Sequence, residues 1–106
     1  MSKQNNDFKK NVDEILRNIP VGSVTTYGAI AEKAGLRSGA RMVGWILNSL
    51  KHDQSMPCHR VINRMGELSG SGHFPSPTYM EDMLKSEGIE VKDGRVDIKK
   101  YFWQPE

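Results

Sequence analysis

The sequence has a single cysteine among its 106 residues. An internal disulfide is therefore excluded, and nothing in the chain calls for an oxidising compartment. The sequence also lacks an apolar run long enough to cross a membrane, and its first ten residues are polar, unlike a signal peptide. We expect a single domain over residues 1–106, with residues 1–6 disordered, in a cytoplasmic protein that has no contact with membranes.

Signals for metals and cofactors are equally scarce. The lone cysteine and the three histidines are dispersed, without the spacing of metal ligands. The segment Gly70-Ser71-Gly72 is too short to indicate a phosphate-binding loop. We therefore expect no metal and no cofactor.

The charge is small but unevenly distributed. The net charge is +2, yet residues 20–66 contain six Lys or Arg against two acids, whereas residues 67–106 contain five against eight. The basic middle of the chain is suited to phosphate groups. An ordinary solvated surface fits the charge pattern equally well, because no block of like charges is present.

The first half of the chain has the periodicity of helices. Apolar residues recur at helical spacing from Phe8 to Ile19, which predicts a helix over residues 7–18 that Pro20 and Gly22 end. A short extended piece, residues 24–26, leads to two further predicted helices, residues 27–33 and 39–49, the second capped by Ser38. Two short helices with a tight turn between them are typical of a helix-turn-helix.

The second half predicts one helix and a hairpin. Thr78 and Glu81 have the spacing of a capping box for a helix that runs to Glu87. Residues 89–91 and 96–98, joined across Asp93-Gly94, predict a β-hairpin. The fold class that follows is mainly α with a small β-hairpin, a winged helix-turn-helix DNA-binding domain. On its second helix, Arg41, Gly44 and Asn48 would face outward, as a DNA-reading face or as an ordinary solvated one.

The chemistry of the chain centres on Cys58. A lone cysteine is usually a small buried hydrophobe. Here Pro57, His59 and Arg60 surround it with polar groups and a stiff backbone, which favours an accessible thiol near a base. We expect residues 59–63 to be extended, so that the Cys58 and His59 side chains point to opposite faces and need a bridging water.

Glu87 is the third unusual residue. It continues the apolar stripe of Met80, Met83 and Leu84, so its carboxylate is predicted to face the core at a helix C-terminus. Burial of a carboxylate requires a partner, and a histidine that must be oriented and charged is a suitable one. A frayed, exposed helix end is the alternative.

These motifs resemble those of a known family. The segment Pro57-Cys58-His59-Arg60-Val61 resembles the active-site motif of O6-alkylguanine-DNA alkyltransferases. The flanking elements agree in order: Ile19-Pro20-x-Gly22-x-Val24-x-x-Tyr27-Gly28, Ala40-Arg41-x-Val43-Gly44 and Ser86-Glu87-Gly88. The short chain and its ending are more similar to the compact alkyltransferase-like proteins, which usually have Trp or Ala where this chain has Cys58.

The resemblance implies roles for individual residues. Cys58 would accept the alkyl group, His59 would deprotonate it through water, and Glu87 would orient His59. Tyr27 would press on the phosphate of the target nucleotide and help to rotate it. Arg41 would fill the gap that the rotated base leaves.

The resemblance also implies the DNA contacts and the base pocket. Ala40 and Gly44 would let the helix approach the minor groove closely, and Arg60 would add a further DNA contact. The guanine pocket would be lined by Pro57, Val61, Ser69, Gly70 and Ser71.

The function expected from the resemblance is DNA repair by irreversible transfer of an alkyl group from O6-alkylguanine to Cys58, once per protein molecule. One alternative is a lesion sensor without enzymatic activity that binds O6-alkylguanine and recruits nucleotide excision repair proteins. Another is a plain winged-helix regulator with an inert cysteine. The expected partner is double-stranded DNA that contains O6-alkylguanine, bound by a monomer at the nucleoid.

Overall fold

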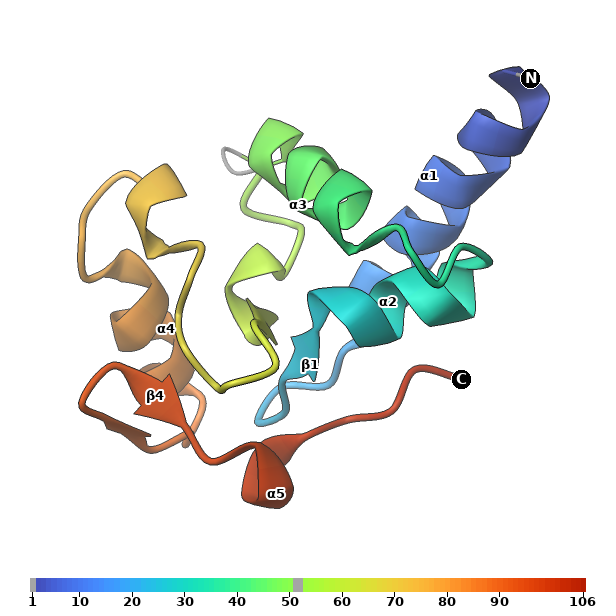
Figure 1. Ribbon diagram of the computed structural model, residues 1–106. Coiled ribbons are helices and arrows are strands. Elements are labelled where there is room, and N and C mark those ends of the chain that lie inside the picture. Colours follow the sequence, from blue (N-terminus) through green and yellow to red (C-terminus); the bar gives the residue numbers. More distant parts are fainter. Residues whose placement is uncertain (1, 51–52) are drawn as a thin grey trace.

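The computed structural model describes residues 2–50 and 53–106. Residues 51 and 52 belong to a polar stretch before Cys58 and lie outside this part. Figure 1 shows a mainly helical molecule with short strands, as the sequence predicts. The elements in chain order are α1 (Ser2–Asn18), β1 (Thr25–Thr26), α2 (Tyr27–Ala34), α3 (Ala40–Ser49), η1 (Cys58–Arg60), β2 (Val61–Ile62), η2 (Ser71–His73), α4 (Tyr79–Ser86), β3 (Val91–Lys92), β4 (Arg95–Val96) and α5 (Ile98–Tyr101).

Helix α1 is longer than predicted. It begins at Ser2, so residues 2–6, which we expected to be disordered, continue the helix. Its apolar stripe is buried as the periodicity predicts, with Val12 and Leu16 fully covered. The stripe packs against α2 and α3, and this contact defines the first core of the molecule.

Helices α2 and α3 form the predicted helix-turn-helix. The Thr26 hydroxyl accepts a hydrogen bond from the Ala29 backbone N–H at 3.1 Å and starts α2. Gly35 ends it in the left-handed conformation, with φ of 110°. The predicted cap of α3 is wrong, because the N-cap residue is Gly39 and not Ser38, and no side chain caps this helix.

A parallel pair of short strands connects the two halves of the chain. Thr25 pairs with Val61 and Thr26 with Ile62. The predicted extended run from residue 59 is wrong at its start, because residues 58–60 form the 3-10 turn η1. Within this turn the Arg60 N–H donates to the Pro57 carbonyl at 3.0 Å, which the extended form would not allow.

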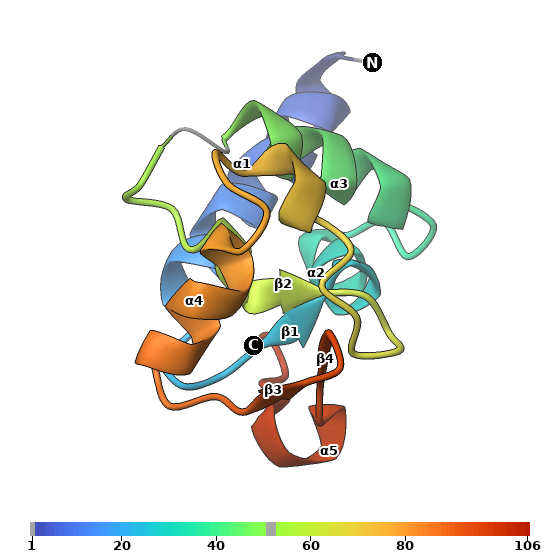
Figure 2. The same cartoon turned by 90° about the vertical axis from the view of Figure 1, so that its left-hand side faces the viewer.

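The C-terminal half contains α4 and the predicted hairpin. Strands β3 and β4 are antiparallel, and Asp93 and Gly94 connect them with φ of 53° and 74°. The predicted capping box is absent, because the Thr78 side chain makes no capping hydrogen bond. Figures 1 and 2 show the hairpin at the end of the molecule opposite α3.

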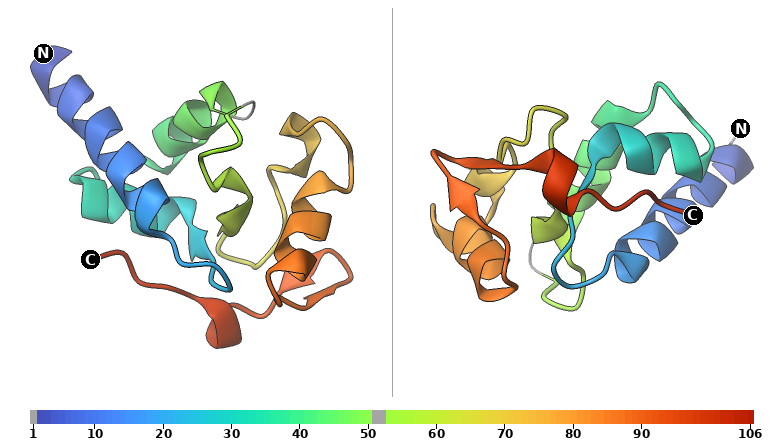
Figure 3. Two further views of the ribbon diagram at one scale, coloured as in Figure 1. Left: turned by 180° about the vertical axis from the view of Figure 1, so that it is seen from behind. Right: turned by 90° about the horizontal axis from the view of Figure 1, so that it is seen from below.

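A second core lies under α4. It is composed of Val24, Ile62, Met80, Leu84, Ile89 and Val96. Figure 3 shows the C-terminal tail turning back from α5 toward the α1–α2 end, where the Trp103 N–H donates to the Val24 carbonyl at 2.7 Å. Among the described helices, none has the length and apolar character needed to span a bilayer.

Candidate functional site

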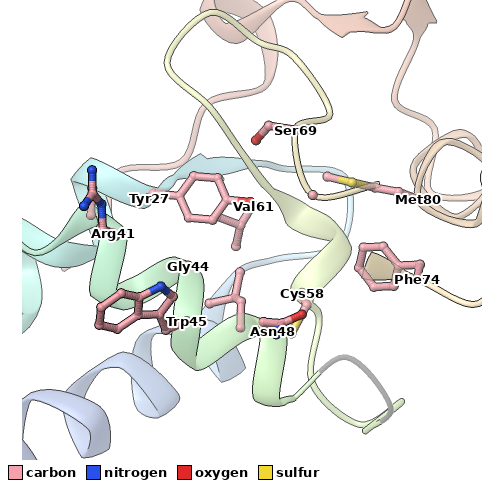
Figure 4. Close-up of a pocket in the computed structure, with 13 residues that line it drawn as sticks. Tyr27, Arg41, Gly44, Trp45, Asn48, Cys58, Val61, Ser69, Phe74 and Met80 are labelled. Atoms are coloured by element: carbon pink, nitrogen blue, oxygen red, sulfur yellow. The ribbon is translucent and has the colours of Figure 1, made fainter. Parts of the chain in front are cut away.

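A pocket of about 560 Å³ opens between the two cores. This volume lies within the range of about 300–1,000 Å³ that is common for small-molecule sites. Figure 4 shows Arg41 and Trp45 of α3 on one side and Phe74 and Met80 on the other, with Cys58 beside Asn48. The pocket is lined by Tyr27, Ala40, Arg41, Gly44, Trp45, Leu47, Asn48, Cys58, Val61, Ser69, Gly70, Phe74 and Met80.

Helix α3 forms one wall of this pocket. Arg41, Trp45 and Asn48 follow one another at helical spacing on the same face and are exposed. A side chain at Gly44 would meet no atom within 4 Å, so this part of the helix surface is open to a close approach. The predicted outward face of the helix is therefore also the pocket wall.

Tyr27 reaches across the pocket from the start of α2. Its hydroxyl lies so close to Gly70 that a Cβ at this glycine would be 3.1 Å from the hydroxyl oxygen. Any side chain at position 70 would therefore displace Tyr27 slightly. The loop around residues 69 and 70 and the first turn of α2 are thus fitted to each other.

Cys58 lies at the inner surface of the pocket, where it is 5% exposed. Burial raises the pKa of its thiol to about 11, with smaller contributions from the carboxylates of Asp53 and Asp13, which repel a thiolate. At pH 7.5 only about one molecule in 3,000 would then carry the thiolate, which is the nucleophilic form. This disfavours reaction of Cys58 as a nucleophile at neutral pH.

The predicted contact between Glu87 and His59 is present. The His59 Nε2 and the Glu87 Oε2 are 2.8 Å apart, and both side chains are almost fully buried. Glu87 also accepts hydrogen bonds from Arg60, from Nε at 2.9 Å and from a terminal nitrogen at 2.7 Å. The remaining guanidinium nitrogen of Arg60 donates to the Ile19 carbonyl at 2.8 Å.

This arrangement, which we call the Glu87 cluster (His59, Arg60 and Glu87), contains a carboxylate and a neutral imidazole. Burial alone would raise the pKa of Glu87, but the hydrogen bonds from Arg60 and His59 hold it below its usual value. Burial lowers the pKa of His59, and this effect outweighs the opposing effect of Glu87. A neutral His59 therefore donates its Nε2 proton to Glu87, and it is Glu87 rather than the thiol that it contacts.

The cluster engages Arg60, a residue that is predicted to contact DNA. All three guanidinium nitrogens of Arg60 are bonded inside the protein, and its side chain is only 13% exposed. Arg60 thus holds η1 against α4 and the end of α1. Three of its five N–H donors are thus engaged within the protein, and a contact with DNA would have to compete with these bonds.

Three of the five residues predicted for the base pocket line this cavity. Val61, Ser69 and Gly70 line it, together with the predicted DNA contacts Ala40, Arg41 and Gly44. Pro57 is buried and does not line the pocket, whereas Ser71 lines a separate, smaller cavity that contains Glu67, Glu81 and Asp93. These two residues are corrections, and they follow from the 3-10 turns at residues 58–60 and 71–73.

Sequence reasoning missed four residues of the pocket, Trp45, Leu47, Phe74 and Met80, and it placed Asn48 on the outward face of the helix without assigning it to the pocket. For Trp45 and Asn48 a signal was available, because their spacing from Arg41 places them on one face of α3. Phe74 and Met80 come from a distant segment, and their spacing does not indicate this side of the molecule. Among the described residues, no group of three His, Cys, Asp or Glu side chains could hold a metal ion.

Comparisons with known proteins agree on the family. Residues 7–89 match the family of the 6-O-methylguanine DNA methyltransferase, DNA binding domain. A protein of Escherichia coli strain K12 named DNA base-flipping protein is 37% identical over 102 residues, which cover 95% of this chain and 78% of the relative. The structure of Schizosaccharomyces pombe Atl1 in complex with damaged DNA containing O6-carboxymethylguanine superposes with a TM-score of 0.83, at 33% identity, and the match covers 94% of this chain and 97% of that one.

Named methyltransferases match less completely. The methylated-DNA–protein-cysteine methyltransferase of Methanosarcina acetivorans is 35% identical over 88 residues, which cover 83% of this chain but 55% of the enzyme. The proteins matched over most of both lengths are the base-flipping and alkyltransferase-like ones.

The predicted enzymatic activity, transfer of an alkyl group to Cys58, is therefore wrong. The relatives that share the compact form are base-flipping and alkyltransferase-like proteins, and the methyltransferases are partial matches. The Cys58 thiol is buried with its pKa raised to about 11, which disfavours the thiolate that an alkyl acceptor needs.

The helix-turn-helix, the pocket beside α3 and the Glu87 cluster all lie within the part of the chain that the family model matches. With a family match over residues 7–89 and a relative of the same length that superposes closely, the chain belongs to the family of the 6-O-methylguanine DNA methyltransferase DNA-binding domain.

Proposed function

We propose that the chain is a lesion sensor, which binds double-stranded DNA containing O6-alkylguanine, rotates the altered nucleotide into its pocket and holds it there with the alkyl group intact. The observation that carries this function is the position of the pocket. An apolar cavity of about 560 Å³ opens directly beside the exposed face of a helix-turn-helix helix, and the cysteine at its inner surface is buried with a raised pKa.

The outer part of the site is suited to an opened duplex. Arg41 is exposed in the first turn of α3, and no hydrogen bond or ion pair among the described residues holds its guanidinium. Ala40 and Gly44 on the same helix present little side-chain bulk, so the groove floor can come close to the helix. In this function Arg41 fills the space left by the rotated base, and Tyr27 presses on its phosphate.

The inner part of the site is suited to an alkylated base. Val61, Phe74 and Met80 supply apolar walls that cover an aromatic ring and a hydrocarbon substituent. Rotation of a base out of the duplex costs a few kcal/mol, and this cost is smallest for a badly paired base. O6-alkylguanine is such a base, so the selectivity of the sensor begins with the weakness of its base pair.

The bound lesion would then have to be removed by other proteins. A thiol with a pKa of about 11 is mostly protonated at neutral pH and therefore a weak nucleophile, which leaves the alkyl group in place. We propose that the complex marks the site for nucleotide excision repair proteins, which cut the strand and not the alkyl bond.

Binding of a short fluorescent duplex tests this function. One duplex carries a single O6-methylguanine, and the matched control carries guanine at the same position. We expect the lesion duplex to bind at least about tenfold more tightly, since one disturbed base pair is worth about 1–3 kcal/mol in such complexes. Cys58→Ala should retain this preference, whereas equal affinity for the two duplexes would contradict the proposal.

A further inference from the structure

Trp45 stands out among the residues of α3. It is 67% exposed, although it is the largest side chain of the helix. The neighbouring apolar residues Met42 and Ile46 pack against the first core, whereas Trp45 is absent from both cores. A large aromatic ring left in water is an unfavourable arrangement that a binding surface explains.

Nothing within the described part of the chain holds the indole ring. Phe74 stacks on Tyr79 with ring centroids 5.1 Å apart, and the Lys100 ammonium lies over the Tyr101 ring at 5.4 Å. Trp45 has no aromatic or cationic partner of this kind among the described residues. Its flat faces are therefore available for stacking.

The location of Trp45 limits what it can contact. The residue lines the pocket mouth and lies one helical turn after Arg41 on the same face of α3, as Figure 4 shows. Four residues of helix span about 6 Å, which corresponds to about two base steps of a duplex. A group placed there meets the nucleotides next to the one that Arg41 replaces.

We propose that Trp45 is a DNA-contacting residue whose indole ring stacks against the minor-groove side of the nucleotides flanking the rotated base and holds the duplex open. This inference rests on the proposed function, and it assigns a second wedge to α3 beside Arg41. Aromatic and apolar wedges of this kind stabilise unstacked steps in minor-groove complexes. The open surface at Gly44 leaves the groove floor room to reach the ring.

The fluorescence of Trp45 provides a direct test. Trp103→Phe removes the only other tryptophan, which lies in the C-terminal tail and packs against the first core. In this background we expect addition of the lesion duplex to quench the emission of Trp45 in step with binding, because stacking on bases quenches an indole. An unchanged spectrum while the labelled duplex shows binding would overturn the proposal.

Affinity gives a second readout. Trp45→Ala should weaken binding of the lesion duplex about 5- to 100-fold, and Trp45→Phe should weaken it less, because a phenyl ring still stacks. The matched control is Val21→Ala, which removes an apolar side chain that is 68% exposed in the loop between α1 and β1. Equal loss in the Ala and control variants would overturn the role of Trp45.

The same experiments separate this inference from the proposed function. If the unaltered protein binds both duplexes equally, the sensor function fails, while quenching by either duplex would still support a DNA contact at Trp45. If the lesion preference is retained but the fluorescence of Trp45 does not change on binding, only the role of Trp45 fails. Quenching that depends on protein concentration without DNA would indicate self-association and would overturn the inference.

Discussion

Two groups of side chains flank Cys58, and they differ in almost every physical property. On one side of it, the Glu87 cluster is buried, and its members form hydrogen bonds with one another and with the Ile19 carbonyl. In front of it, Arg41, Trp45 and Asn48 on α3 are exposed. The first group holds η1, α1 and α4 together, and the second is free to meet a ligand.

This difference explains why the motif around Cys58 is misleading when it is read as chemistry alone. A carboxylate bonded to a histidine next to a cysteine is typical of nucleophilic catalysis. Here the same residues also form a buried junction, and the pKa of the thiol beside them is raised to about 11. The proposed function therefore assigns the contacts with a ligand to α3, outside this motif.

The largest effect should come from breaking the buried group. Glu87→Ala leaves Arg60 as a buried cation without its partner, and we expect a loss of about 3–5 kcal/mol in the free energy of unfolding. Urea denaturation measures this loss. The control is Glu90→Ala, an exposed carboxylate three residues later that should change stability by about 0.5 kcal/mol or less. Equal stability of the two variants would show that the cluster is not a structural junction.

The next effect should come from the exposed group. Arg41→Ala should weaken binding of the lesion duplex about 10- to 100-fold, because the gap left by the rotated base would have no side chain to fill it. Stability should stay within about 0.5 kcal/mol, since the side chain is exposed. Arg37→Ala is the matched control, as it removes an exposed arginine whose guanidinium is 3.4 Å from Glu32 in the turn before α3. Unchanged lesion affinity in Arg41→Ala would contradict the assignment.

A smaller effect should come from acid, which lowers the free energy of unfolding through the buried group and not through the exposed one. The pKa of His59 is lower in the folded protein than in the unfolded chain, so the unfolded chain takes up a proton first as pH falls below about 6.5. The pKa of Glu87 is lowered as well, which removes further stability as pH falls below about 4.5. Stability should therefore be constant at neutral pH and decline progressively below it. In His59→Gln the decline between pH 7 and 5 should be shallower, and an identical profile would contradict the assignment.

The smallest effect on binding should come from the cysteine itself. Cys58→Ala should leave the affinity for the lesion duplex within about threefold and cost about 1 kcal/mol of stability, since only a small buried side chain is removed. In the native protein the thiol should react slowly with iodoacetamide at pH 7.5, and at least about tenfold faster in urea, where its pKa returns to about 8.5. Fast alkylation of the native protein would show that the thiol is activated.

Much of the fold could be predicted from local patterns. Helical spacing identified the stripe of α1, and Asp93-Gly94 identified the hairpin, because both depend on residues close together in the sequence. The contact of Glu87 with His59 was also predictable, since a carboxylate on an apolar stripe requires a partner.

Other features depend on contacts between distant segments. Arg60 bonds to Glu87, 27 positions away, and to Ile19, 41 positions away, and no local pattern distinguishes this from a surface arginine. Whether a cysteine is reactive depends on which way its polar neighbours point, and the 3-10 turn directs His59 toward α4. The exposure of Trp45 depends on how α3 packs against the rest of the molecule, and the spacing of residues along the helix does not determine this packing.

The most direct test of the account combines binding and mass in one sample. The protein is incubated with a duplex that contains one O6-methylguanine, binding is confirmed by fluorescence anisotropy, and the intact mass of the protein is then measured. The account predicts a saturated complex and an unchanged protein mass. A gain of one methylene on the protein, located at Cys58 and absent in Cys58→Ala, would contradict it.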